Sequence, residues 1–127
     1  KKLDKFIKAR RRVFDVYKKE LVNVKEIAAP EITKNAVSAN HIFVIRTKDP
    51  TKRNPLANYL KQSGIGVNFH YPSVYAHPYY RKNGYANLAL KNADIYHNTC
   101  ITLPLYVTLK NSQIKYISDK IKAFFKV

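Results

Sequence analysis

The run from His41 to Thr47, which reads H-I-F-V-I-R-T, constrains the fold more than any other part of this chain. Its β-branched and aromatic residues predict a strand, and Asp49-Pro50 ends it. Apolar residues at successive positions are typical of a strand that is buried on both faces. The sequence therefore predicts a sheet with this strand in its middle.

Helical spacing of apolar residues recurs in four segments: 1–21, 55–63, 87–98 and from about 111 to the C-terminus. Pro55 suits the first turn of the second helix and Gly64 its end, while Asn111 or Ser112 can cap the last one.

Shorter strands are expected at 65–69 and 101–103, with at most a short edge strand within 22–40. Helices and strands alternate, which predicts an α/β (α+β-like) fold. We expect a small three-to-four-stranded sheet with helices mainly on one face.

The chain has 127 residues, enough for one core and too few for two. It lacks an apolar run long enough to span a membrane and a secretory signal pattern, so we expect a cytoplasmic protein without a membrane partner. It has one cysteine, Cys100, which excludes an internal disulfide and favours a small buried strand residue. The sequence contains no Met, and Lys1 already lies within a helical pattern, so we expect a piece of a longer protein.

The net charge of +16 could indicate nucleic acid or another polyanion as a partner. The basic residues are spread over the whole chain, apart from Arg10-Arg11-Arg12. Spread charge focuses the electrostatic field poorly, so a solvated surface is the favoured interpretation. On the first helix, the three arginines are expected to face solvent or another subunit.

Residues 70–81 form the candidate functional loop. The segment is rich in Tyr, His and Pro and has no helical or strand period. Such a loop is uncommon in a compact domain unless it makes a site. His70 and His77 have no Cys or carboxylate near them in the sequence, so a zinc site is not expected. Asp94 and His97 could share a proton on one helical face, although exposed polar surface is the commoner explanation.

A sheet-borne aromatic platform for RNA is the runner-up, with Phe43, Phe69 and Tyr71 as its members. The alternating aromatic residues of the usual RNA-binding strand are missing here.

Four motifs in order resemble the DegT/DnrJ/StrS family of nucleotide-sugar aminotransferases. The chain carries K-L-D, R-R, Tyr and Leu along residues 2–21, F-V-I-R at 43–46, H-Y-P followed by P-Y-Y-R at 70–81, and L-P-L-Y at 103–106. The loop and Asn92-Ala93-Asp94-x-Tyr96 look most similar to enzymes that aminate position 4 of a UDP-linked deoxy sugar, as in pseudaminic acid synthesis.

The resemblance implies a pyridoxal-phosphate-dependent transaminase that moves an amino group from glutamate to a keto sugar on a nucleotide. Residues 1–127 would be its C-terminal small domain, with 1–21 as the linking helix and 22–127 as the sheet-and-helix layer. The catalytic large domain, with its Schiff-base lysine, would be absent. The parent would be a homodimer that binds pyridoxal phosphate, while this fragment would bind none and be inactive, with no catalytic, cofactor or metal residues of its own.

The resemblance also assigns site residues. His70 and Tyr71 would contact the nucleotide-sugar or the cofactor edge, and Pro72 would fix the turn. Tyr75 and His77 stand where the family has His and Gln. Tyr75 can donate a hydrogen bond but cannot act as an imidazole base.

If the large domain is absent, the surface on which it would dock should be exposed. We expect this surface to be apolar and aromatic, and to be formed by part of residues 1–21 and by loop 70–81. A free-standing basic RNA- or polyanion-binding module is the alternative function, although nucleic acid is not the expected partner.

Overall fold

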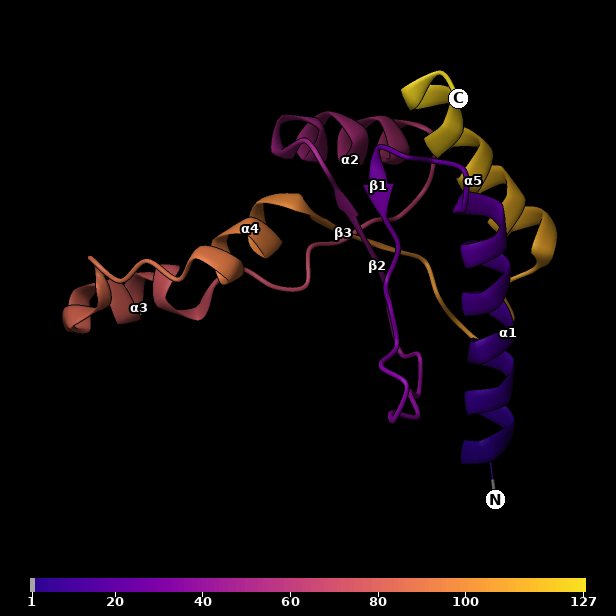
Figure 1. Cartoon of the computed structure of the whole chain (residues 1–127), viewed down its shortest axis with the longest axis horizontal. Coiled ribbons are helices and arrows are strands. Elements are labelled where there is room, and N and C mark those ends of the chain that lie inside the picture. Colours follow the sequence, from indigo (N-terminus) through magenta and orange to yellow (C-terminus); the bar gives the residue numbers. More distant parts are fainter. Residues whose placement is uncertain (1) are drawn as a thin grey trace.

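The computed structural model describes residues 2–127 (Figure 1). The helices are α1 (Leu3–Leu21), α2 (Arg53–Gln62), α3 (Pro78–Tyr80), α4 (Lys91–Thr99) and α5 (Asn111–Phe125). The strands are β1 (Ile27–Ala28), β2 (Phe43–Thr47) and β3 (Cys100–Leu103). Three short helical turns are also present: η1 (Pro50–Lys52), η2 (Val74–Ala76) and η3 (Arg81–Tyr85).

The strands form one antiparallel sheet in the order β1-β2-β3. Phe43 pairs with Leu103, and Arg46 pairs with both Cys100 on β3 and Ala28 on β1. The predicted strand at 41–47 is therefore confirmed as the middle of the sheet.

Only one face of β2 is fully buried. Phe43 and Ile45 point into the core, whereas Val44 is half-buried and Arg46 is exposed on the other face. The expectation that both faces are buried was wrong, because the described helices α1, α2 and α5 all lie on the Phe43 side. Their position agrees with the prediction of helices mainly on one face of the sheet.

The core joins α1 to the sheet through aromatic rings. The Tyr17 ring stacks on Phe43 with centroids 4.7 Å apart, and Phe14 meets the same ring edge-on at 5.0 Å. All three side chains are buried. Full burial of a side chain of this size contributes about 1.5–3 kcal/mol, so these contacts fix the angle between α1 and the sheet.

Helix α1 buries only its second half. Val13, Tyr17 and Leu21 are buried, but Leu3 and Phe6 near the N-terminus are exposed. The sequence predicted one packed face along the whole helix, and the structure corrects this. The first two turns extend past the sheet and contact little of the described chain (Figure 1).

Arg12 joins α1 to the start of α5. Its guanidinium donates to the Leu109 carbonyl at 2.7 Å and to the Asn111 side-chain oxygen. Arg12 was expected to face solvent or another subunit. It is exposed, and it also bonds within the chain.

Asn111 was a predicted cap, but it is the first residue of α5. The side chain of Gln113 instead accepts from the Lys110 backbone N–H at 2.9 Å.

The predicted strand at 65–69 does not form. Gly64 ends α2 at φ 76°, as expected, but only Asn68 then bridges to Thr102 of β3. The bridge is a reciprocal pair of backbone hydrogen bonds of 3.2 and 2.7 Å. Phe69 does not continue it, because its backbone N–H donates instead to the Asn68 side-chain oxygen at 2.8 Å. The Phe69 ring lies under the Arg53 guanidinium, which is 3.5 Å from the ring centroid.

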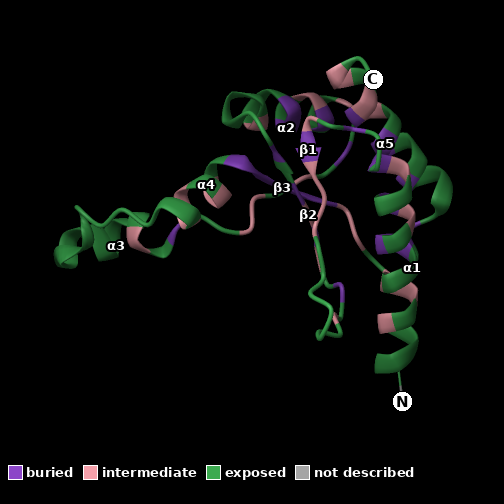
Figure 2. Cartoon of the chain, in the orientation of Figure 1, coloured by how far each residue is buried: buried purple, intermediate pink, exposed green. Residues whose placement is uncertain are grey.

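Residues 70–90, which we call the arm, extend away from the core (Figure 1). Most of its residues are exposed, in contrast with the sheet and the helices that cover it (Figure 2). The arm consists of η2, α3 and η3, with Gly84 at φ 95° between turns. Helix α4 begins only at Lys91, because Leu88 and Leu90 belong to the arm and are exposed. The expected start at 87 was therefore wrong.

Candidate functional site

The candidate site lies where the arm leaves the sheet. His70 follows the bridge at Asn68, and its ring Nδ1 lies 2.9 Å from the Thr102 hydroxyl of β3. The carbonyl of His70 accepts a hydrogen bond of 3.1 Å from the Tyr96 hydroxyl on α4. Both the ring and the backbone of His70 are therefore held by neighbouring elements.

Tyr96 is suited to this role because it keeps its proton. Partial burial raises the pKa of Tyr96, with a smaller contribution from Cys100. The phenol therefore stays neutral through the physiological range and remains a donor to the His70 carbonyl.

Tyr71 and Pro72 come next and face solvent. The Tyr71 side chain is 72% exposed, and its ring stands edge-on to the His70 ring with centroids 4.6 Å apart. The peptide bond between His70 and Tyr71 is cis. Ser73, in contrast, is buried, which anchors the turn after Pro72.

Tyr75 and His77 point in different directions. The Tyr75 hydroxyl donates to a carboxylate oxygen of Asp94 on α4, and the side chain is half-buried. His77 is exposed, and within residues 2–127 no hydrogen bond is found to its ring. The structure thus brings His70 and Tyr71 together, turns Tyr75 toward α4 and leaves His77 on the surface.

Asp94, Tyr96 and Thr102 hold the loop and were not assigned to it from the sequence. Asp94 was considered as a partner of His97 or as exposed polar surface. It is half-buried and bonds to Tyr75 instead, so exposed surface was the wrong explanation. No spacing in the sequence indicated these contacts, because they join residues that are 19 to 32 positions apart.

The thiol of Cys100 is buried in β3, as predicted. Burial raises the pKa of Cys100, although the nearby Arg53 lowers it in part. The thiol therefore stays protonated near neutral pH and is a poor nucleophile.

The RNA platform does not form as the runner-up required. Phe43 is buried beneath Tyr17, and Phe69 is covered by Arg53, so neither ring is open for a base to stack on. Only Tyr71 of the three rings is exposed.

No group of three His, Cys, Asp or Glu residues in 2–127 is arranged to hold a metal ion. None of the described helices is both long and apolar enough to cross a membrane.

The described lysines do not fit a Schiff-base site for pyridoxal phosphate. A Schiff-base lysine needs a dry pocket that lowers its pKa. Every lysine in residues 2–127 is exposed or half-buried. Hydrogen bonding to Asp119 raises the pKa of Lys115, which is the opposite of what a Schiff-base lysine needs. The lysines of residues 2–127 therefore do not lie in such a dry pocket.

Comparison with known proteins finds relatives over nearly the whole chain. The DegT/DnrJ/EryC1/StrS aminotransferase family matches residues 1–122. The spore coat polysaccharide biosynthesis protein SpsC of Bacillus subtilis is 25% identical over 131 residues, which cover 99% of this chain and 34% of that protein. The UDP-4-amino-4,6-dideoxy-N-acetyl-beta-L-altrosamine transaminase of Campylobacter jejuni is 25% identical over 121 residues, covering 94% and 32%.

Among solved structures, Helicobacter pylori PseC, an aminotransferase involved in the biosynthesis of pseudoaminic acid, superposes with a TM-score of 0.90. The identity is 19%, and the match covers 98% of this chain and 34% of PseC. The chain thus spans about a third of the length of these relatives. It belongs to the DegT/DnrJ/EryC1/StrS aminotransferase family.

Proposed function

We propose that this chain is the C-terminal small domain of a pyridoxal-phosphate-dependent aminotransferase that transfers an amino group from glutamate to a keto sugar on a nucleotide. The domain would be residues 1–127, with α1 as the link to a preceding large domain. The family membership and the coverage of about a third of each relative support this. Without the large domain the chain would be inactive and bind no cofactor.

The observation that carries the proposal is the fixed position of His70. Its ring is held by Thr102 and its carbonyl by Tyr96, while the adjacent Tyr71 is open to solvent. A wall of a substrate cleft needs this combination, because a held backbone presents an exposed donor at low entropic cost. In the parent, His70, Tyr71 and Pro72 would contact the nucleotide-sugar.

Tyr75 and His77 have weaker support as substrate contacts. The hydroxyl of Tyr75 is already bonded to Asp94, so we assign it to holding the loop. His77 is exposed on the arm and is free to contact a ligand or another subunit. A homodimeric parent would offer that second surface.

The first test is the native product. We expect a polypeptide about three times the length of this chain, as in the relatives, that is yellow and is bleached by glutamate. A colourless native product of only this length would contradict the proposal. It would favour the basic binding module, whose affinity for RNA would fall steeply with salt.

The second test is Tyr71→Phe in the parent, with UDP- and dTDP-linked 4-keto sugars as substrates. Loss of one hydrogen bond should raise the KM for the sugar by about 2- to 13-fold. The KM for glutamate should not change. Tyr106→Phe is the matched control, because Tyr106 is also exposed but lies after β3, outside the arm. Equal effects of the two variants would rule out a role for Tyr71 in binding.

A further inference from the structure

Strand β2 is longer than β1, so part of its edge on the β1 side has no partner strand. The β1 ladder contains only two pairs, Ile27 with Thr47 and Ala28 with Arg46. Residues 43–45 pair with β3 on the other side but have no partner on the β1 side. In the described chain no backbone hydrogen bond joins residues 29–32 to 40–45. Such an edge is a ready template for another strand.

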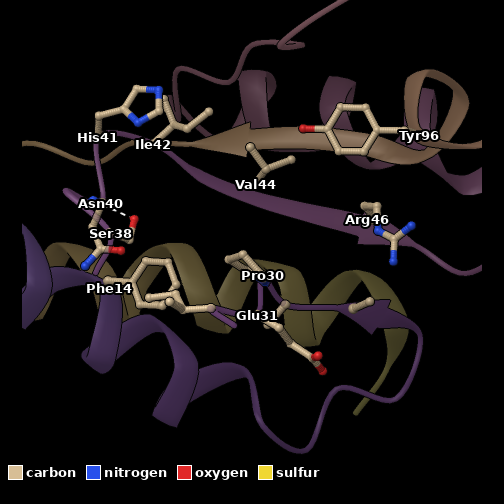
Figure 3. Close-up of a pocket in the computed structure, with 13 residues that line it drawn as sticks. Phe14, Pro30, Glu31, Ser38, Asn40, His41, Ile42, Val44, Arg46 and Tyr96 are labelled. Atoms are coloured by element: carbon tan, nitrogen blue, oxygen red, sulfur yellow. Dashed lines mark hydrogen bonds between the residues drawn. The ribbon is translucent and has the colours of Figure 1, made fainter. Parts of the chain in front are cut away.

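A cavity of about 450 Å³ lies along this edge, on the face of the sheet that carries Val44 and Arg46. Figure 3 shows Val44 and Ile42 of the β2 segment on one side and Phe14 and Pro30 on the other. These apolar side chains form part of the walls between the two ends, and the side chains of Tyr96 and Glu31 lie beside them (Figure 3). At one end lie Asn40 and Ser38, and at the other lies Arg46 (Figure 3).

Asn40 is the unexplained residue of this cavity. Its side chain is 3% exposed, yet neither its amide oxygen nor its amide nitrogen has a partner within the described chain. Its backbone N–H donates to the Ser38 hydroxyl at 3.0 Å, which holds it in place at φ 47°. Burying two unpaired polar atoms is unfavourable, so a partner is expected in the cavity. A carboxamide places a donor beside an acceptor, and a peptide group satisfies both.

Arg46 adds charge to the other end. It is exposed, and within residues 2–127 no carboxylate lies within ion-pair distance of it. The chain as a whole carries a net charge of +16. An occupant with an acidic side chain near Arg46 would therefore be complementary.

We propose that this groove receives an extended polypeptide segment that adds to the free edge of β2. Asn40 would bind a peptide group of that segment, its apolar side chains would cover Val44, and an acidic side chain would meet Arg46. The segment belongs to the same protein, within the two thirds of the family's length that precede this domain. This source rests on the proposed function, because relatives that share this fold are about three times as long.

The position of α1 agrees with that source. Phe14 of α1 lines the groove, and the exposed Leu3 and Phe6 lie two to three turns earlier on the same helix. Exposed apolar side chains thus lie on α1 between the groove and the N-terminal end of the helix, with Arg10 and Arg11 separating them from Phe14.

Hydrogen–deuterium exchange tests the proposal in two forms of the protein, the full-length parent and the 127-residue chain. The backbone amides of residues 42–45 that face the β1 side should exchange at least about tenfold more slowly in the parent. Amides of Ile101 and Thr102 in β3, on the other side of β2, serve as the reference. Equal exchange in the two forms at 42–45 would overturn the proposal while leaving the proposed function intact.

Asn40→Gly separates binding from folding. Glycine accepts the positive φ without strain and removes the unpaired amide, so the 127-residue chain should unfold at the same temperature or higher. In the parent, the same variant should abolish most of the extra protection at 42–45. Asn23→Gly is the control, because Asn23 is exposed in the turn after α1. A lowered unfolding temperature in the short chain would show that Asn40 serves the fold, and would overturn the assignment.

Two further outcomes identify other occupants. If the 127-residue chain forms dimers that protect 42–45, and Asn40→Gly disperses them, the occupant is a second copy and the proposal is wrong. If the native product has only this length and is colourless, the proposed function fails, and this proposal fails with it for that separate reason.

Discussion

The core and the arm both contain aromatic residues but are held by different forces. In the core, Tyr17 and Phe43 are buried against each other. In the arm, the Tyr79 and Tyr80 rings meet edge-on yet both remain exposed. The arm is attached to the rest through hydrogen bonds of His70 and Tyr75. Burial thus fixes one region and a few polar contacts fix the other, so substitutions should act on them very differently.

The largest effect is expected in the core. Phe43→Ala should lower the free energy of unfolding by about 3–5 kcal/mol, because a fully buried ring packed by Phe14 and Tyr17 leaves a cavity. Tyr79→Ala in the arm should change it by less than about 0.5 kcal/mol. Urea unfolding of both variants measures the difference. Comparable losses would mean that the arm packs in solution on a surface that the core provides.

Alkaline pH should also weaken the core before the arm. Burial raises the pKa of Tyr17 above its ordinary value near 10, with a smaller contribution from Tyr106. The folded state then holds this proton more tightly than the unfolded chain. The stability that the Tyr17 proton contributes is fully present below about pH 10. Above that pH the free energy of unfolding falls by up to about 1.4 kcal/mol per pH unit.

Tyr17→Phe is the control for this titration. It loses the hydrogen bond to the Pro104 carbonyl and is less stable at neutral pH, but its stability should fall less steeply above pH 10. Cys100 and Tyr96, whose pKa values are also raised by burial, account for the slope that remains. Equally steep curves for the two proteins would show that Tyr17 does not control alkaline unfolding.

Arg12 gives a smaller and sharply local effect. Arg12→Ala removes the bonds to Leu109 and Asn111 and should cost about 1–2 kcal/mol. Arg11→Ala is the matched control, because Arg11 is its exposed neighbour with no hydrogen bond found within residues 2–127. Arg11→Ala should be neutral within about 0.5 kcal/mol. If the two variants cannot be told apart, the contact between α1 and α5 does not depend on Arg12.

The contrast between the core and the arm also explains which parts of the fold could be predicted from the sequence. The elements of the core follow from periodicity, since β2 and the helices around it bury apolar residues at regular spacing. The family motifs located the His70–Tyr71 loop as well. Periodicity failed at 65–69, where only Asn68 bridges to β3 and the Phe69 N–H donates to the Asn68 side chain. It also failed at Leu88 and Leu90, whose helical spacing is not matched by burial.

The contacts that hold the loop were beyond pattern reasoning for a different reason. Tyr75 and Asp94 are 19 residues apart, and His70 and Thr102 are 32 apart. Single polar side chains at such separations leave no period in the sequence. Asn40 is similar, since its burial follows from the path of residues 29–42 and not from its neighbours in sequence.

The smallest change in stability should accompany a large change in the arm. Tyr75→Phe removes only the hydroxyl that bonds Asp94, so the free energy of unfolding should fall by less than about 1 kcal/mol. The arm has few other contacts, and local opening should therefore become several-fold more frequent. Limited proteolysis at the exposed Tyr79 and Tyr80 measures this opening. Tyr116→Phe controls for loss of a phenol elsewhere, because its hydroxyl bonds the Ser63 carbonyl on the opposite side of the core from the arm. Faster cleavage in Tyr75→Phe alone would establish that α4 holds the arm through Asp94. Equal cleavage in all three proteins would mean that the bonds to His70 suffice, and the role of Tyr75 would return to the substrate.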